Sequence, residues 1–396
     1  MPVPITWQAA MSAALYGSAG FFVAGAGPAA HFRTSAHAVP VLGTALLRLL
    51  DRVDAALGRP DRLDVVDVGA GRGELLSTLA RLAPPELARR LRLIAVELAP
   101  RPGPLAAGID WRRTVPDRVT GLLLGTEWLD NVPLDVAAPG PAGWHRLLVD
   151  PTTGIETIGG PVGPVGAARA AGPIGAARAA GPIGAARAAG PIGAARAAGP
   201  IGATDAAGPI GATDAVGAMD AAEAAWLAEW WPADPFEAGL GGRAEIGLPR
   251  DTAWAAAVAA VDRGLALAVD YGHLRDSRPV DGTLTGFRAG RQVLPVPDGS
   301  CDLTAHVAMD SVAAAGSTTA GLPYRLVTQR AALRSLGADG ARPPLALAAT
   351  DPAGYVQALA RASTAAELTD PAGLGGHWWL LQPVGVDPAG LLAAWG

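Results

Sequence analysis

Short stretches rich in Leu, Val and Ile alternate along this chain with longer stretches in which apolar residues recur at helical spacing. Short, strongly apolar stretches are typical of strands buried in a sheet. The predicted strands are Leu63–Val68, Leu91–Glu97, Ile109–Arg113, Thr120–Gly125, Leu265–Asp270, Tyr324–Thr328 and His377–Gln382. The predicted helices between them are Leu75–Leu82, Asp251–Asp262 and Pro352–Ala362. The alternation predicts an α/β fold, with a seven-stranded, mostly parallel sheet covered by helices on both faces.

A separate helical segment precedes the first predicted strand. It spans residues 1–58 and contains an amphipathic helix near Trp7–Leu15 and a longer one around Val39–Leu57. The α/β domain follows in two parts, residues 59–165 and 218–396, on either side of a low-complexity insert at residues 166–217. The insert separates the fourth and fifth predicted strands. We therefore expect it to emerge at the carboxyl edge of the sheet, where ligands bind in such folds.

The insert is an internal repeat of nine residues, Gly-Ala-Ala-Arg-Ala-Ala-Gly-Pro-Ile. Four copies carry arginine, at positions 169, 178, 187 and 196, and the next two carry Asp205 and Asp214 in the same place. Each Gly-Pro interrupts a helix, and one Ile per copy cannot build a continuous core. The repeat predicts a flexible or loosely helical insert. A docking arm for an acidic partner is the functional alternative.

Composition excludes several classes of protein. All 31 basic residues are arginine, which excludes a Schiff-base lysine, a pyridoxal enzyme and a Walker-type phosphate loop. The net charge of −5 gives no sign of nucleic-acid binding. One cysteine, Cys301, and six scattered histidines argue against a disulfide framework and against a metal cluster.

Signals for export or membrane insertion are absent from the sequence. The N-terminus Met1–Trp7 has neither a basic start nor an apolar core of the kind that signal peptides contain. No uncharged apolar run approaches the length that spans a bilayer. These features predict a soluble, cytoplasmic protein without membrane insertion, and they leave the oligomeric state open.

The stretch Val65–Glu74 holds the clearest candidate binding site. It reads as a buried strand that contains Asp67, followed by a turn with Gly69, Ala70, Gly71 and Gly73, and then a helix. Glycines permit a turn that side chains would block, and a helix N-terminus presents free N–H groups to a ligand. The third glycine comes one residue too early for the dinucleotide fingerprint. The alternative is a glycine turn in an unrelated α/β protein.

Two further acids fit a nucleoside-containing ligand at this turn. Glu97 ends the next predicted strand, where a carboxylate can accept both hydrogen bonds from a ribose diol. Asp110 and Trp111 follow on the short third strand, where an acid can accept from an adenine amino group and an aromatic ring can stack on it. The glycine turn with Asp67 in the strand before it resembles motif I of class I S-adenosylmethionine (SAM) methyltransferases, and Glu97 follows at the end of the next strand. The resemblance implies SAM as the cofactor and the class I methyltransferase sheet.

Several other motifs narrow the resemblance to one family. They are Met11–Tyr16, Gly20–Phe22, Phe32–Ser35, Thr126–Pro133, Val269–Gly272, Gly282–Leu284 and Asp302–Val307. In this order and spacing they resemble the MidA family of SAM-dependent methyltransferases, from Ile5 to the C-terminus around the insert. The resemblance implies methylation of an arginine on a protein substrate, since mitochondrial members modify a subunit of respiratory complex I and aid its assembly. The chain departs from the family at Ala30–Phe32, where Gly-Asp-Phe is usual, and at Thr126, where Asn is usual.

Three acids at strand ends are the candidate catalytic residues. Glu127 and Asp130 follow the fourth strand, and Asp270 ends the fifth. Paired carboxylates can grip a guanidinium and help to remove its proton during methyl transfer. Structural alternatives stay open: Glu127 could bind a backbone amide, Asp130 could cap a helix and Asp270 could brace its strand. For His306, a structural role is favoured over a general base.

Three functions are compatible with these residues. The leading one is a protein arginine methyltransferase, as the resemblance implies. The second is a small-molecule methyltransferase, and the third is a SAM-binding assembly factor without transfer activity. Glu127 and Asp130 argue against the third, whereas the changed Gly-Asp-Phe segment at Ala30–Phe32 allows it.

Overall fold

The structure is a computed structural model that describes residues 3–23, 35–103, 105–140, 143–161, 221–231 and 242–395. The predicted insert at residues 166–217 and the Ala30–Phe32 segment lie outside the described residues. Among the helices in the described ranges, none combines the length and the apolar character that crossing a bilayer requires.

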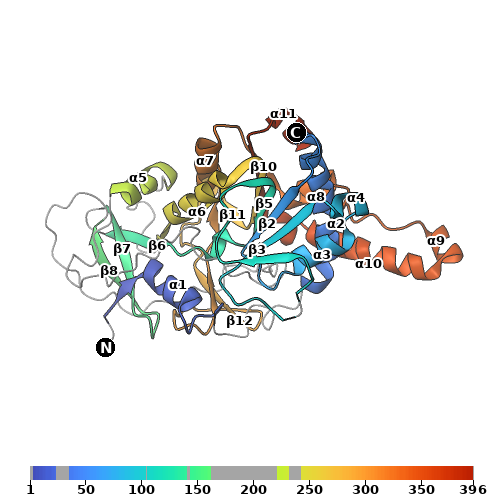
Figure 1. Ribbon diagram of the computed structural model, residues 1–396. Helices are drawn as coiled ribbons and strands as arrows, with labels where there is room; N and C mark the ends of the chain where they lie inside the picture. The colour runs from blue at the N-terminus through green and yellow to red at the C-terminus, as the bar shows by residue number, and fades with distance from the viewer. Residues whose placement is uncertain are drawn as a thin grey trace.

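A seven-stranded sheet forms the centre of the chain (Figure 1). Its strands are β2 (Leu63–Val68), β3 (Leu91–Val96), β4 (Ile109–Arg112), β5 (Val119–Thr126), β10 (Val261–Asp270), β16 (Arg325–Thr328) and β17 (Trp378–Val384). Their order across the sheet is β16-β17-β10-β5-β2-β3-β4. The pairs from β10 to β4 are parallel, whereas β17 is antiparallel to both of its neighbours. The sheet is therefore mixed, with parallel pairing in the majority.

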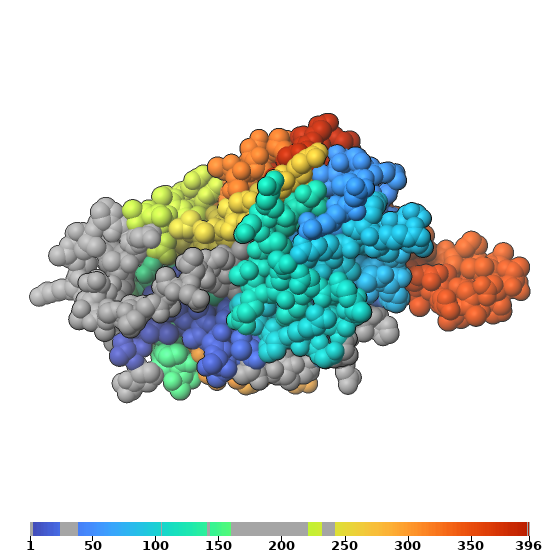
Figure 2. Space-filling view, viewed as in Figure 1, coloured from blue at the N-terminus to red at the C-terminus, as the bar shows by residue number. Residues whose placement is uncertain are grey.

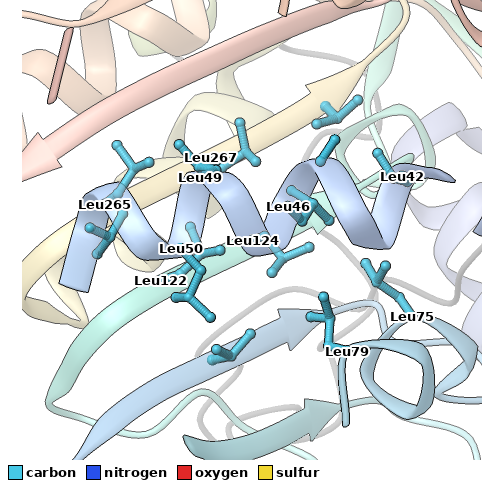
Figure 3. Close-up of a cluster of buried hydrophobic side chains, with 14 of the residues drawn as sticks. Leu42, Leu46, Leu49, Leu50, Leu75, Leu79, Leu122, Leu124, Leu265 and Leu267 are labelled. Atoms are coloured by element: carbon cyan, nitrogen blue, oxygen red, sulfur yellow. The ribbon is translucent and has the colours of Figure 1, made fainter. Parts of the chain in front are cut away.

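Helices cover both faces of this sheet, as the sequence predicted. One face packs against α2 (Ser35–Ala56), α3 (Glu74–Leu82), α8 (Gln329–Ser335), the end of α10 (Pro352–Leu368) and α11 (Pro388–Leu392). The other packs against α6 (Leu248–Ala259) and α7 (Met309–Ala320). Successive strand residues alternate between the two cores: Leu122 and Leu124 contact α2 (Figure 3), while Leu123 faces the α6–α7 side. This alternation explains why the strands are apolar throughout.

Two predicted helices have different bounds in the structure. The helix expected at Asp251–Asp262 is α6 and begins at Leu248, because Pro249 fits a first helical turn, where no N–H partner is needed. The end of the predicted range was wrong, since Val261 and Asp262 already belong to β10. Helix α10 continues to Leu368, beyond the predicted end at Ala362.

A second, smaller sheet was not predicted from the sequence. It consists of β1 (Ile5–Thr6), β6 (Asp135–Gly140), β7 (Gly143–Val149), β8 (Glu156–Pro161) and β9 (Ala244–Ile246). Helix α1 (Trp7–Tyr16) packs on one of its cores and α5 (Ala221–Trp230) on another. The two predicted N-terminal helices thus lie in different cores, α1 with the small sheet and α2 with the main one.

Short elements complete the described chain. They are α4 (Pro85–Ala88), α9 (Leu345–Thr350), β11 (Gly272–His273), β12 (Thr285–Arg288), β13 (Arg291–Val293), β14 (Asp302–Thr304) and β15 (Val307–Ala308). Helix α9 and the adjoining part of α10 project from the body of the molecule (Figure 2). Strands β11 and β15 pair just beyond the end of β10, so they extend the structure at the carboxyl edge of the main sheet.

Candidate active site

The predicted glycine turn is present at the carboxyl end of β2. Gly69, Gly71 and Gly73 have φ values of +69°, +59° and +75°, which a residue with a side chain rarely adopts. Helix α3 starts directly afterwards at Glu74, with Gly73 as its N-cap. A Cβ at Gly73 would also come within 2.6 Å of the Leu105 side chain. The backbone here is thus open to close approach by a ligand, next to a helix N-terminus.

Glu97 lies against this turn, as expected. One oxygen of its carboxylate accepts a hydrogen bond from the Gly71 N–H at 2.9 Å, and the other accepts from the Leu98 and Ala99 N–H groups. The side chain is buried, and burial raises its pKa to about 7, with the nearby Asp67 carboxylate adding to the rise. Asp67 is itself fully buried in β2. The structure thus brings Asp67, the glycine turn and Glu97 together.

Asp110 has a different environment from the other predicted cofactor residues. Its carboxylate pairs with Arg112 at 2.8 Å and with Arg92 at 3.4 Å, and the side chain is 40% exposed. The adjacent Trp111, by contrast, lies near the turn. A Cβ added to Gly73 would contact its ring. The Trp111 indole N–H donates to the Ala99 carbonyl, and this bond holds the ring beside the residues that follow Glu97. A contact of Asp110 with adenine stays a prediction.

Glu127 follows β5 with an unusual backbone conformation. Its φ is +49°, and among the described residues only Arg59 and Ala289 are other non-glycine residues with positive φ. The Glu127 N–H donates to the Val269 carbonyl at 2.7 Å, which holds this conformation at the end of β10. The side chain is buried. Such backbone strain, of order 1–3 kcal/mol, persists where surrounding structure enforces it and is frequent at functional sites.

Asp130 belongs to the short 3₁₀ turn Leu129–Asn131 and does not cap it through its side chain. Its carboxylate accepts hydrogen bonds from the hydroxyls of Tyr271 and Thr304, the latter at 2.7 Å. The carboxyl is buried, and burial raises its pKa above the ordinary value. Asp130 therefore fixes the position of the Tyr271 hydroxyl, a contact that sequence analysis had not anticipated.

Asp270 makes contacts that favour the bracing role. Its carboxylate accepts from three backbone N–H groups, those of Leu129, Asp130 and Tyr271, at 2.9, 3.3 and 3.0 Å. These bonds join the end of β10 to the turn after β5. Asp270 is buried, and burial together with the Asp130 charge raises its pKa well above the usual range. The side chain thereby helps to hold the turn that carries Glu127 and Asp130.

Arg250 is a buried cation beneath this edge that sequence analysis missed. Its guanidinium, on α6, donates to the backbone carbonyls of Asp130, Val132, Ala305 and His306 at 2.5–3.3 Å. Burial lowers the pKa of this guanidinium, while the nearby carboxyl groups of Glu245, Asp130 and Asp270 favour its charged form. The Leu248-Pro249-Arg250 helix start was visible in the sequence. Nothing there, however, indicated that the arginine would be buried.

Three aromatic rings pack together near the end of β10, and one of them, His377, lies close to Glu127. The Tyr271 ring packs edge-to-face with the His306 ring at 5.1 Å and with the His377 ring at 5.5 Å between centroids. His306 is exposed, whereas His377 is buried. The His377 Nε2 lies 3.9 Å from the Glu127 Oε1. The carboxyl edge of the sheet therefore combines the buried Glu127 with the cluster of aromatic rings, and such a surface suits a planar cation.

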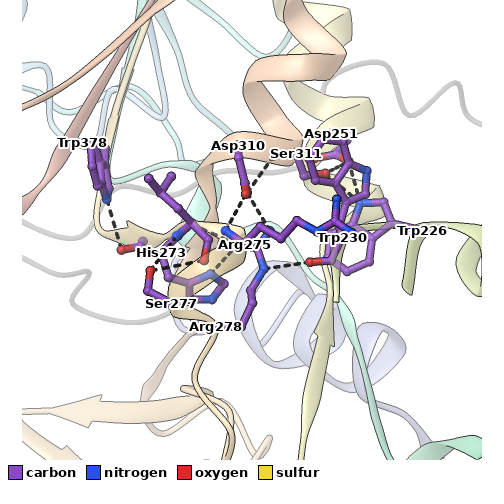
Figure 4. A network of polar contacts seen from close by, with 12 residues as sticks. Trp226, Trp230, Asp251, His273, Arg275, Ser277, Arg278, Asp310, Ser311 and Trp378 are labelled. Carbon is purple, nitrogen blue, oxygen red and sulfur yellow. Dashed lines mark hydrogen bonds and ion pairs between the residues drawn. The ribbon is translucent and has the colours of Figure 1, made fainter. Parts of the chain in front are cut away.

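A polar network surrounds His273 and Arg278, just beyond the end of β10 (Figure 4). Arg278 donates to His273 Nδ1 at 2.7 Å, to Asp310 at 2.6 Å and to the Trp230 carbonyl at 2.9 Å. Burial and the Arg278 charge lower the pKa of His273 to about 3, which keeps this ring neutral. His273 in turn lies 6.5 Å from His306 between ring centroids. The network links β11 to α5 and α7 and is structural in its contacts.

Comparisons with known proteins show the family of this chain and similar folds. A family model described as "Putative S-adenosyl-L-methionine-dependent methyltransferase" matches residues 42–326. A protein from Burkholderia thailandensis bound to S-adenosyl-homocysteine has a similar structure, with a TM-score of 0.68 and 21% identity over 98% of this chain and 90% of that one. An uncharacterized protein from the same organism gives a TM-score of 0.65 and 22% identity over 97% and 88%. No curated protein matches the chain.

An α/β sheet with a glycine turn and an acid at the next strand end defines a protein that binds a nucleoside-containing cofactor. The family model covers most of the sequence, so the chain belongs to this family of SAM-dependent methyltransferases. The match confirms the resemblance to the MidA family and SAM as the expected cofactor.

Proposed function

We propose that this chain transfers the methyl group of SAM to a guanidinium nitrogen of an arginine in a protein substrate. The observation that carries the proposal is the position of Glu127. A buried carboxylate, on a backbone with positive φ, lies at the carboxyl edge of the sheet that also bears the glycine turn. The strand order across that sheet, with its single antiparallel strand β17, supports the class I methyltransferase arrangement.

The residues present fit SAM at the turn. The glycines with positive φ allow its amino-acid and ribose portions to approach the backbone, and Glu97 can accept hydrogen bonds from the ribose hydroxyls. Trp111 offers a ring beside the turn for the adenine. When bound, SAM supplies an electrophilic methyl group that a nucleophile displaces from sulfur in line.

The protein groups at the edge have complementary tasks. Arginine is a poor nucleophile because its guanidinium stays protonated and delocalised. The Glu127 carboxylate can bind this cation, localise its charge and accept the proton that the reacting nitrogen loses. Asp130 holds the Tyr271 hydroxyl, so the Tyr271 ring presents a fixed surface to the guanidinium. Asp270 holds the turn on which Glu127 lies.

Labelling tests the proposal directly. The purified chain is incubated with methyl-tritiated SAM and an extract of its source organism, and labelled proteins are hydrolysed to amino acids. We expect label in a protein band and recovery of that label as methylarginine. Label in the small-molecule fraction would favour a small-molecule acceptor. Absence of any transfer, with SAM binding intact, would favour an assembly factor, and either result would contradict the proposal.

A further inference from the structure

The antiparallel direction of β17 places His377 at the carboxyl edge of the parallel strands, where the candidate site lies. If β17 ran parallel to β10, the residue that precedes it would lie at the opposite edge of the sheet from the site. Because β17 runs the other way, its first residue Trp378 pairs with Asp270 at the end of β10 and with Thr328 at the end of β16. His377 therefore stands level with the turn that carries Glu127, although 250 positions separate the two residues in the chain (377 minus 127).

The contacts of His377 leave one ring nitrogen directed at Glu127. The backbone of Leu374 favours a proton on the ring, and Nε2 has no hydrogen-bond partner among the described residues, so we assign the proton to Nδ1. Nε2 consequently carries a lone pair. The side chain is only 4% exposed, and burial lowers its pKa to about 4, so the ring is neutral near pH 7. A buried acceptor of this kind calls for a donor.

The distance between the two acceptors fits a shared donor. The His377 Nε2 and the Glu127 Oε1 are 3.9 Å apart, too far for a hydrogen bond between them. A nitrogen about 2.9 Å from each acceptor can donate one N–H to each. The Tyr271 ring, packed edge-to-face on His377, keeps the imidazole in place.

We propose that His377 contacts the methyl acceptor: its Nε2 and the Glu127 Oε1 together accept two hydrogen bonds from the nitrogen-bearing group that receives the methyl. The proposal rests on the proposed function, because it concerns the same edge. It makes His377 a specificity-determining residue. An acceptor with two N–H donors can bind Glu127 and His377 together, whereas a hydroxyl or thiol nucleophile that binds Glu127 has no second hydrogen to give to the buried His377 Nε2.

Nitrogen NMR tests the contact without depending on turnover. Full-length protein with ¹⁵N-labelled histidine is saturated with S-adenosylhomocysteine and titrated with N-acetyl-arginine amide. The His377 signals are assigned by their loss in His377→Gln. We expect the Nε2 resonance to move as it accepts a hydrogen bond, and tetramethylammonium, a cation without N–H groups, to leave it in place. An unmoved resonance, or equal shifts with both cations, would overturn the proposal.

Two substitutions test the functional consequence. His377→Phe keeps an aromatic ring against Tyr271 but removes the acceptor, whereas His377→Gln restores an acceptor oxygen near Nε2. We expect methyl transfer from labelled SAM to extract protein to fall about 10- to 100-fold in His377→Phe, the range for losing one hydrogen bond to a charged group, and to recover largely in His377→Gln. SAM affinity should be unchanged in both variants.

A matched control separates this role from a structural one. His145→Phe alters another buried histidine whose Nε2 has no partner among the described residues, on β7 of the small sheet. It should retain wild-type transfer. Equal losses in His377→Phe and His377→Gln, or full activity in His377→Phe, would refute the contact. If the wild type transfers no methyl group at all, the proposed function fails, and the NMR titration still decides the role of His377.

Discussion

Glu127 is the residue on which the proposed chemistry depends most. Its carboxylate is buried, its backbone is held at positive φ by the bond to Val269, and the His377 ring lies close to its side chain. The sequence motif Thr126–Pro133 indicated this residue. The structure adds that Asp130 and Asp270, expected beside it as catalytic acids, are bound to hydroxyls and backbone amides respectively.

The first prediction concerns the charge of Glu127. Glu127→Gln keeps the shape of the side chain but cannot take a proton, so turnover should fall roughly 10²–10⁴-fold, the usual range for a positioned acid–base group. SAM affinity should change little, because the glycine turn and Glu97 hold the cofactor. Initial rates of label transfer at saturating SAM measure the first quantity and calorimetry the second. Near-normal turnover would exclude the proposed role, and a parallel loss of SAM affinity would assign Glu127 to the cofactor site.

The second prediction concerns the protonation of Glu97. Ribose hydroxyls donate to the ionised carboxylate, and the pKa of Glu97 in the free protein is raised to about 7. SAM should therefore bind about tenfold more weakly at pH 6 than at pH 8, since binding at the lower pH must first remove a proton. Calorimetric titrations across this range measure the effect, and Glu97→Gln should bind weakly with no such dependence. Constant wild-type affinity would show that Glu97 is already ionised or does not contact SAM.

The raised pKa of Glu97 also affects the stability of the fold, with the opposite pH dependence: SAM affinity rises with pH, whereas this contribution to stability falls. A carboxyl whose pKa rises from 4.5 to about 7 on folding is protonated more readily in the folded state. Its contribution to the free energy of unfolding is therefore fully present below pH 4.5 and is lost as the pH rises through about 7. SAM binding, which favours the ionised form, offsets this loss at neutral pH.

At the scale of elements, the main sheet could be predicted because most of its strands give a clear apolar signal. Several of the elements that were missed are short or interrupted. Strand β9 has three residues, β6 contains Pro139 and ends in glycine, and β1 has two residues. Such segments become strands only through pairing with distant partners, as β1 does with β7. Local periodicity carries no information about that pairing.

Strand direction explains why His377 was missed. The predicted strand His377–Gln382 nearly matches β17, but a strand with buried apolar residues looks the same in either direction. Only the antiparallel pairing with β10 shows that its first residues lie at the ligand edge. Asp110 illustrates the converse case: the strand was predicted, but the side chain is directed to Arg92 and Arg112.

The third prediction concerns the repeat insert between β8 and α5. Because each of its first five copies has one Ile per nine residues and a Gly-Pro, it cannot contribute a continuous core. Deleting residues 166–217 should change the melting temperature by no more than a few degrees, a stability change below about 1 kcal/mol. A Gly-Ser replacement of equal length controls for loop length. A large loss of stability in both variants would mean that the repeat makes stabilising contacts.

At the scale of the whole molecule, the proposed site draws on segments from most of the chain. Glu127 follows β5, Tyr271 follows β10, His306 follows β14 and His377 precedes β17. Buried Arg250 joins two of these segments through its bonds to the carbonyls of Asp130, after β5, and of Ala305 and His306, after β14. The site therefore forms only when the main sheet is complete, which is why local sequence motifs identified its parts but not their arrangement.

The fourth prediction tests the central claim that this chain uses the glycine turn to bind SAM. Calorimetric titration of the full chain with SAM should give saturable heat for one site, and NADH should neither bind nor compete. Gly71→Val should abolish this heat, because a β-branched side chain at a φ of +59° strains the turn and blocks the approach of the cofactor. Circular dichroism checks that the variant is folded. The absence of heat with wild-type protein, or equal affinity in folded Gly71→Val, would contradict the account.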